Sequence, residues 1–194
     1  VVSQSLLMLL IADFFSYWLH RAAHTIPLLW RLHQVHHSPE KLYWLNVGRF
    51  HPLEKLLQLS LTSFPFILLG IEEQVLTLYL IFYSINGFFQ HSNIRLRFGP
   101  LNYLVSSAEL HRWHHSRSPK ISGSNFGNNL IIWDLLFGTW FLPKNRIPKI
   151  LGLMNRSFPV DFVNQLKEPF KRRVIPKDTG ISRNSTGKTA LFLL

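Results

Sequence analysis

The chain has 194 residues and a mass of 22.7 kDa, which suits one domain or one compact membrane module. Its 16 Phe, 6 Trp and 5 Tyr exclude disorder as the main state. The absence of Cys excludes a disulfide framework, Cys-ligated zinc, iron–sulfur clusters and thiol catalysis. A net charge of +11 fits anionic lipid or nucleic acid, and 10 His are an unusually high number.

Three apolar runs are the first predicted elements, and none quite reaches the ~20 residues of a clean membrane span. The first covers residues 1–19 and contains one acid, Asp13. The second and third cover 56–71 and 75–89 without any charge. Only Glu72, Glu73 and Gln74 separate the last two runs, so we predict a helical hairpin. Because the chain opens inside an apolar run without Met, we expect it to be N-terminally incomplete.

The charges indicate that these runs are membrane helices, although buried helices of a soluble protein have similar lengths. No Lys or Arg lies between Lys55 and Arg95. Because positive flanks stay cytoplasmic, both ends of the hairpin should be cytoplasmic and its tip should lie on the opposite side. The same rule places the end of the first run, near His20, at the cytoplasmic face. The hairpin also argues against nucleic acid as a partner.

The sequence therefore predicts an all-α, multi-pass integral membrane protein. Residues 20–55 and 91–142 would form a helical cap on the cytoplasmic side. We expect residues 1–142 to be the membrane domain and 143–194 a basic, solvated cytoplasmic tail, because apolar content falls and prolines recur beyond Pro143.

Nine of the ten histidines fall into four groups along the chain. The pattern H-x-x-H-H-S occurs twice, 78 residues apart, and H-x-x-x-H occurs once. Residues at i, i+3 and i+4 of a helix share a face, so each group would aim its imidazoles one way. The histidines are His20 and His24; His33, His36 and His37; His91; and His111, His114 and His115.

Nine imidazoles exceed the ligands of one ion, since zinc takes about four and an octahedral metal about six. The spacing therefore predicts a site for two metals. Imidazole suits iron, copper, nickel or zinc, and the spacing alone leaves these open. The zinc-protease pattern H-E-x-x-H is absent, because Arg21 and Ala22 follow His20. For the isolated His51, a ligand and a simple hydrogen-bonded ring are equally good interpretations.

Several motifs together resemble the sterol desaturase / fatty acid hydroxylase superfamily, especially its bacterial members. They are D-F-F-S-Y-W-L-H-R-A-A-H, L-W-R-L-H-Q-V-H-H-S, R-F-H-P-L-E, F-F-Q-H-S-N, E-L-H-R-W-H-H-S and N-F-G-N-N-L-I-I-W-D-L-L-F-G-T-W, in this order within residues 6–142. Some relatives carry a further histidine four residues after the one that matches His91, where this chain has Arg95.

The resemblance implies a membrane di-iron enzyme that uses dioxygen to hydroxylate or desaturate C–H bonds of a fatty acyl, sterol or related lipid. Electrons would come from an external donor protein, a b-type cytochrome or a ferredoxin. The motifs carry the metal-ligand role over to the nine grouped histidines. His51 lies in the superfamily's R-x-H-P element and would be a ligand or support one.

A metal-bound histidine usually donates its second N–H to a carboxylate or carbonyl. Asp13, Glu54, Glu109 and Asp134 are the candidate carboxylates, and Asp13 is the preferred one because it lies two helical turns before His20. Glu54 could instead pair with Lys55 or Arg49. The alternative function is a non-enzymatic membrane protein that binds metal or b-type haem, although haem would use only one or two of the nine grouped histidines.

Overall fold

The computed structural model describes residues 1–171, and all regular structure within that range is helical. Helix α1 (Val2–Thr25) is followed at once by α2 (Pro27–His37). Ile26 between them is extended, with φ −95° and ψ 117°, because the residue before a proline is disfavoured in helical conformation. The chain reverses here, so that α2 packs against the end of α1 and the histidines of both helices face each other.

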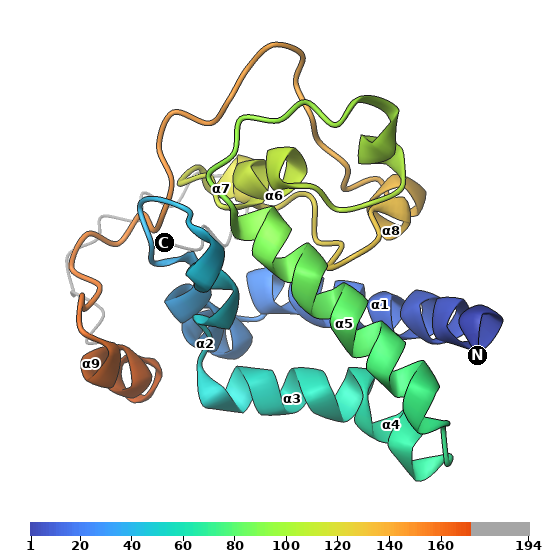
Figure 1. Cartoon of the computed structure of the whole chain (residues 1–194). Helices are drawn as coiled ribbons and strands as arrows, with labels where there is room; N and C mark the ends of the chain where they lie inside the picture. Colours follow the sequence, from blue (N-terminus) through green and yellow to red (C-terminus); the bar gives the residue numbers. More distant parts are fainter. Residues whose placement is uncertain (172–194) are drawn as a thin grey trace, which may run out of the picture.

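The predicted hairpin is formed by α3 (Pro52–Thr62), α4 (Phe64–Leu68) and α5 (Glu73–His91), which the short 3₁₀ helix η1 (Trp44–Gly48) precedes. A proline in the first turn of α4 accompanies the break after α3, and Gly70 adopts a φ of +73° in the turn before α5. Helix α1 packs against both α3 and α5 (Figure 1). The apolar core at this contact includes Met8 and Ala12 of α1 with Val75 and Tyr79 of α5.

Many large apolar side chains on these four helices are exposed, which is typical of a surface that meets lipid. Within residues 1–171, α1 is the helix that is long and apolar enough to cross a membrane by these two criteria. Leu69, at the hairpin tip, is 84% exposed and Ile85 is 64% exposed. The exposed set also contains Leu6, Leu7, Leu56, Leu59, Phe64, Ile67, Leu68, Leu78, Ile81 and Phe88.

Four short helices follow α5 in the chain. They are the 3₁₀ helix η2 (Gly99–Tyr103), α6 (Ala108–His114), α7 (Pro119–Ser122) and α8 (Ile132–Leu136). Helix α6 packs against α5 (Figure 1). Pairing between extended segments in residues 1–171 is limited to two isolated bridges, Val105 with Leu130 and Ser116 with Leu151.

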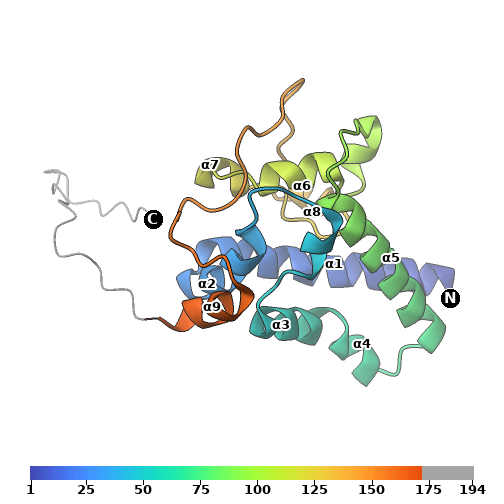
Figure 2. The same cartoon turned by 60° about the vertical axis from the view of Figure 1, so that its left-hand side comes forward.

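Residues 150–170 fold back onto α2, so this part of the expected solvated tail is in fact packed. Leu153 and Phe158 are buried against Val35 of α2. Helix α9 (Phe162–Lys167) and the 3₁₀ helix η3 (Glu168–Phe170) follow (Figure 2), and η3 packs against α2. The apolar spacing of this stretch was too sparse to reveal its core contacts. Residues 172–194 of the predicted tail lie outside the described residues.

Candidate metal centre

The nine grouped histidines meet in one region, where they form two clusters. Cluster A comprises His20, His24, His33, His37 and His114. Cluster B comprises His36, His91, His111 and His115. In each cluster, one ring nitrogen from every member lies within 4.8 Å of those of the other members. The rings come from α1, α2, the end of α5, and α6 with the residue after it.

Each H-x-x-H-H motif contributes to both clusters. On α2, His33 and His37 join cluster A, whereas His36 joins cluster B. The second motif does the reverse, because His111 and His115 join cluster B and His114 joins cluster A. The clusters touch where the rings of His37 and His115 stack with centroids 4.4 Å apart. The motifs thus interleave across a pair of sites, an arrangement that the shared helix face alone did not specify.

Hydrogen bonds on the outer side of cluster A determine which nitrogen carries the proton in three of its five rings. His20 Nδ1–H donates to the carbonyl oxygen of Phe126 (2.8 Å), and His114 Nδ1–H donates to that of Ser124 (2.8 Å). His33 Nδ1–H donates to the Glu54 carboxylate. When such a ring is neutral its Nε2 holds a lone pair, since one nitrogen of a neutral imidazole is a donor and the other an acceptor.

Two of the four rings of cluster B follow the same rule. His36 Nδ1–H donates to the carbonyl of Arg49 (3.3 Å), and His91 Nδ1–H donates to that of Gly87 (2.8 Å). Their Nε2 atoms lie 3.4 Å apart, and His91 Nε2 lies 3.0 Å from His111 Nε2.

The Nε2 lone pairs of His36 and His91 face each other and repel, and a cation between them removes the repulsion. Cluster A contains the same opposition, because His20 Nε2 and His33 Nε2 lie 3.1 Å apart. The buried Nε2 of His114 has no hydrogen-bond partner among the described residues. The residues of both clusters therefore fit metal ions, and imidazole donors suit iron, copper, nickel or zinc.

Burial keeps these rings in the form that binds metal. Desolvation lowers the pKa of His36, His37, His111 and His115 well below the ordinary value of 6.5, and the neighbouring rings add to the effect. Desolvation is also the main cause that lowers the pKa of His114 to about 3. These five rings are consequently uncharged at neutral pH, with lone pairs available for coordination.

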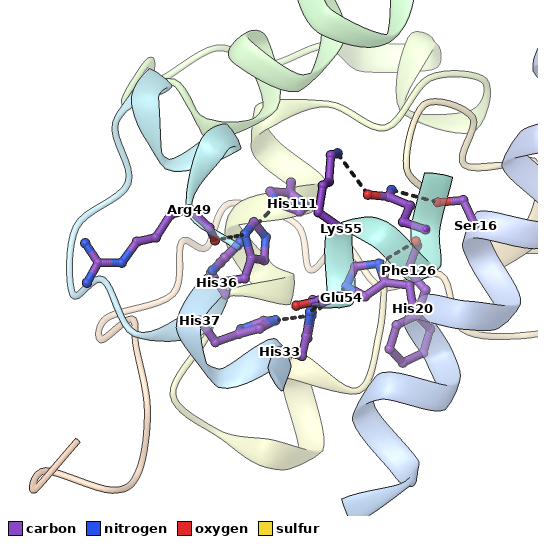
Figure 3. Close-up of polar contacts among 12 residues, drawn as sticks. Ser16, His20, His33, His36, His37, Arg49, Glu54, Lys55, His111 and Phe126 are labelled. Atoms are coloured by element: carbon purple, nitrogen blue, oxygen red, sulfur yellow. Dashed lines mark hydrogen bonds and ion pairs between the residues drawn. The ribbon is translucent and has the colours of Figure 1, made fainter. Parts of the chain in front are cut away.

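Glu54 is the carboxylate that contacts a clustered histidine (Figure 3). The preference for Asp13 in this role was wrong: its carboxylate accepts from the backbone N–H groups of Asn129 (3.0 Å) and Leu130 (2.7 Å). Helical periodicity placed Asp13 on the face of His20 but could not show which group approaches that face from across the fold. Glu54 also forms no ion pair with Lys55 or Arg49 in the described structure.

Two other candidate carboxylates accept hydrogen bonds from backbone N–H groups and not from a histidine. Asp134 accepts from the N–H groups of Phe126 (2.7 Å) and Gly127 (2.6 Å), so it positions the segment whose carbonyl receives His20. Glu109 accepts from the backbone N–H of Phe98 (3.2 Å) and from Asn102 (2.8 Å).

The structure places His51 outside both clusters. Its Nδ1 accepts from the backbone N–H of Leu53 (3.2 Å) and caps α3, while its Nε2–H donates to the carbonyl of Leu166 (3.1 Å). The neighbouring Phe50, in contrast, contacts cluster B directly: its ring stacks on His36 with centroids 4.2 Å apart.

Sequence reasoning missed the carbonyl groups that orient the rings. Ser124 and Phe126 belong to a loop in which Asn125 adopts a φ of +56°, and Gly127 has no room for a side chain: a Cβ there would lie 2.2 Å from the carbonyl oxygen of Leu130. The N-F-G-N-N letters were the available signal, since Asn and Gly favour such backbone.

One cavity extends from the histidines into the helices. Its walls include His20 and His33 of cluster A, and His36, His91 and His111 of cluster B. Apolar side chains, among them Leu19, Leu29, Leu32, Val47, Phe50 and Leu57, form much of the remaining wall. This geometry is that of a helical, histidine-liganded metalloprotein whose metal centre adjoins an apolar cavity.

Comparison with known proteins agrees with this class. The chain matches the fatty acid hydroxylase family over residues 5–139 and belongs to that family. The resemblance to the sterol desaturase / fatty acid hydroxylase superfamily is thereby confirmed. No solved structure matches the chain.

Among curated relatives, the chain is 38% identical to the ornithine lipid hydroxylase OlsE of Rhizobium tropici over 170 residues, which are 88% of this chain and 51% of that protein. It is 32% identical to the alkylglycerol monooxygenase of Xenopus tropicalis over 135 residues, 70% of this chain and 30% of that protein. Identity to the very-long-chain aldehyde decarbonylase GL1-8 of Oryza sativa subsp. japonica is 33% over 141 residues, 72% of this chain and 52% of that protein. The chain thus spans about half or less of these relatives.

Proposed function

We propose that this protein is a membrane-bound non-haem di-iron oxidoreductase that uses dioxygen to hydroxylate or desaturate a C–H bond of a lipid. One observation carries the proposal: two adjacent histidine clusters with opposed Nε2 lone pairs line a single, largely apolar cavity. The names of the relatives support a lipid as substrate, since they describe an ornithine lipid hydroxylase, an alkylglycerol monooxygenase and a very-long-chain aldehyde decarbonylase.

The nine clustered histidines would hold the iron ions, five in one cluster and four in the other. Iron, when bound, supplies the redox chemistry that no side chain can perform. The chain provides geometry: Glu54 and the carbonyls of Arg49, Gly87, Ser124 and Phe126 hold the rings in one tautomer and orientation. The apolar cavity walls exclude water and admit a hydrocarbon chain.

The reaction needs electrons as well as dioxygen, and we propose that a separate b-type cytochrome or ferredoxin supplies them. The lipid is a fatty acyl, sterol or related compound that enters from the bilayer. In this proposal residues 1–142 form the membrane domain, the hairpin crosses the bilayer, and the histidines and the stretch beyond Pro143 lie on the cytoplasmic side. The exposed apolar side chains of α1 and α3–α5 support this placement.

A haem-binding function is not favoured by the site. The Nε2 atoms of His20 and His33 lie 3.1 Å apart, as do those of His33 and His37, and this leaves no room for a porphyrin plane between the rings.

Metal analysis combined with lipid profiling tests the proposed function. The purified protein should contain non-haem iron at both clusters and show no Soret band. A host that expresses the intact protein should accumulate an oxidised lipid that is absent with the His115→Ala variant, which lacks one ligand of cluster B. Iron at both clusters without any change in host lipids would contradict the enzymatic function, and a Soret band would revive the haem-binding one.

A further inference from the structure

Lys55 occupies an unusual environment in the first turns of α3. Its side chain is half-buried, and its Nζ donates to the side-chain oxygens of Gln58 (2.9 Å) and Tyr83 (2.5 Å). The ammonium also lies 5.2 Å from the ring centroid of Phe50 and 4.9 Å from that of Tyr83. In Figure 3 the hydrogen bond of Lys55 is directed away from the Glu54 carboxylate.

No carboxylate forms an ion pair with Lys55 within residues 1–171. The adjacent carboxylate of Glu54 accepts from His33, and the other ion pairs join Glu40 and Glu168 to other cations. Helix stability does not explain Lys55 either, because the N-terminal end of a helix favours acidic residues over basic ones. A half-buried ammonium whose described partners are uncharged groups is suited to an anion from outside the chain.

The partners of Lys55 also line the cavity that the histidines border. Gln58, Tyr83 and Phe50 are part of its wall, together with His36 and His91. Gln58 Nε2 also donates to the hydroxyl of Ser16 (3.5 Å). Ser16, Gln58 and Tyr83 thus form a polar patch on an otherwise largely apolar cavity wall.

The ring of Phe50 links the ammonium to cluster B, because it lies near both. The Phe50 ring stacks on His36 with centroids 4.2 Å apart, and its centroid lies 5.2 Å from the Lys55 ammonium. A group bound at Lys55 would therefore be close to the metal centre, and so would the carbon atoms attached to it.

We propose that Lys55, together with Gln58 and Tyr83, binds the anionic group of the lipid substrate, a carboxylate or a phosphate. This contact selects an acidic lipid over an uncharged one. It also places a carbon near the polar end of the lipid, rather than the end of its hydrocarbon chain, at the histidine clusters. The inference rests on the proposed function for its substrate, but the anion site itself can be measured without turnover.

Equilibrium binding to the iron-loaded, full-length protein in neutral detergent micelles tests the site. The probes are dodecanoate, dodecyl phosphate and the uncharged dodecanol, titrated against wild type, Lys55→Gln, Lys55→Arg and Lys41→Gln. Lys41 is exposed and serves as the matched control. Because all proteins are titrated in the same micelles, partitioning of each probe affects the variants equally.

Lys55→Gln should weaken binding of at least one anionic probe by about tenfold or more, because a hydrogen bond from a charged donor is stronger than one from a neutral amide. Binding of dodecanol should be unchanged, Lys55→Arg should retain most of the anion preference, and Lys41→Gln should match wild type. The probe with the larger loss identifies the anion as carboxylate or phosphate.

Equal binding of anionic and uncharged probes by wild type would overturn the anion site, and so would an anion preference that survives in Lys55→Gln. Iron content measured on the same samples shows that the variant has folded around its metals. Failure of the proposed function is a separate result: it would appear as an absence of lipid oxidation in a protein that still binds anions through Lys55.

Discussion

In five of the nine clustered histidines, the hydrogen bond at the outward-facing nitrogen decides what the inward-facing nitrogen can do. His20, His36 and His91 donate from Nδ1 to backbone carbonyls, and a carbonyl can only accept. Their Nε2 atoms are thereby left as lone pairs that converge on the clusters. The metal sites are thus encoded as much by these acceptors as by the histidines.

We predict that His36→Ala and His114→Ala each abolish lipid oxidation, with His36→Ala causing the larger loss of iron. Cluster B would retain three imidazoles after the loss of His36, whereas cluster A would retain four after the loss of His114. Because the two ions would act as a unit, the double variant should be little less active than either single one. Iron per chain and product formation are the measurements.

His51→Ala is the control for these variants. It removes the cap of α3 and the bond to Leu166 but no clustered nitrogen. It should cost about 1 kcal/mol of stability, as the loss of a helix cap does, while iron content is retained. Full iron and full activity in either His36→Ala or His114→Ala would refute the ligand assignment.

Glu54 offers a second test at the scale of one residue. Glu54→Ala should lower metal affinity by about 10- to 100-fold, because His33 loses the acceptor that orients its ring. Glu54→Gln should cost less, since an amide oxygen can still accept from Nδ1–H. The exposed Glu40→Ala is the control, and competition with a chelator measures the affinity. An affinity equal to that of wild type in Glu54→Ala would mean that Glu54 has no orienting role.

At the scale of the structural elements, the loop from Ser124 to Leu130 supports cluster A. Asp134 holds it at Phe126 and Gly127, and Asp13 holds it from α1 at Asn129. The Asn125 side chain donates to the carbonyls of Leu110 (3.0 Å) and Phe141 (2.8 Å). Anchored in this way, the loop presents its carbonyls to two rings of cluster A.

Gly127→Ala should therefore disturb cluster A without touching a histidine. The added Cβ would lie 2.2 Å from the carbonyl oxygen of Leu130 and 2.9 Å from Asp134 Oδ2, so the loop must move. We expect a loss of stability of about 1–3 kcal/mol and reduced iron content. Gly123→Ala is the matched control, because its Cβ would meet nothing closer than 3.4 Å. Thermal unfolding and iron analysis distinguish the two variants, and equal behaviour would refute the role of the loop.

Across the whole molecule, the exposed apolar side chains of α1, α3, α4 and α5 contrast with the buried polar clusters beside them. We predict that a tag at Glu73 is accessible only from the non-cytoplasmic side, whereas a tag beyond Lys144 is accessible from the cytoplasm. The reason is the absence of Lys and Arg between Lys55 and Arg95. Labelling of intact cells before and after permeabilisation measures both. A Glu73 tag on the cytoplasmic side would refute the proposed membrane topology.

The sequence by itself determined which histidines gather and that helices carry them, because i, i+3 and i+4 spacing is a property of one helix. It also indicated the apolar hairpin, since a run of uncharged residues needs no tertiary context to be recognised. Glu54 was visible as a candidate, but its neighbours in sequence suggested ion pairs with Lys55 or Arg49 equally well.

Only the tertiary structure decided how the histidines divide and what the carboxylates contact. The division depends on which rings of α2 meet α1 and which meet α5, and no spacing within one helix encodes that. Asp13 bonds to Asn129 across 116 positions, and His51 bonds to Leu166 across 115. Such contacts arise because buried polar groups need hydrogen-bond partners, and the packing of the helices decides which partners are near. The order of residues along the chain does not show which distant residues the fold brings together.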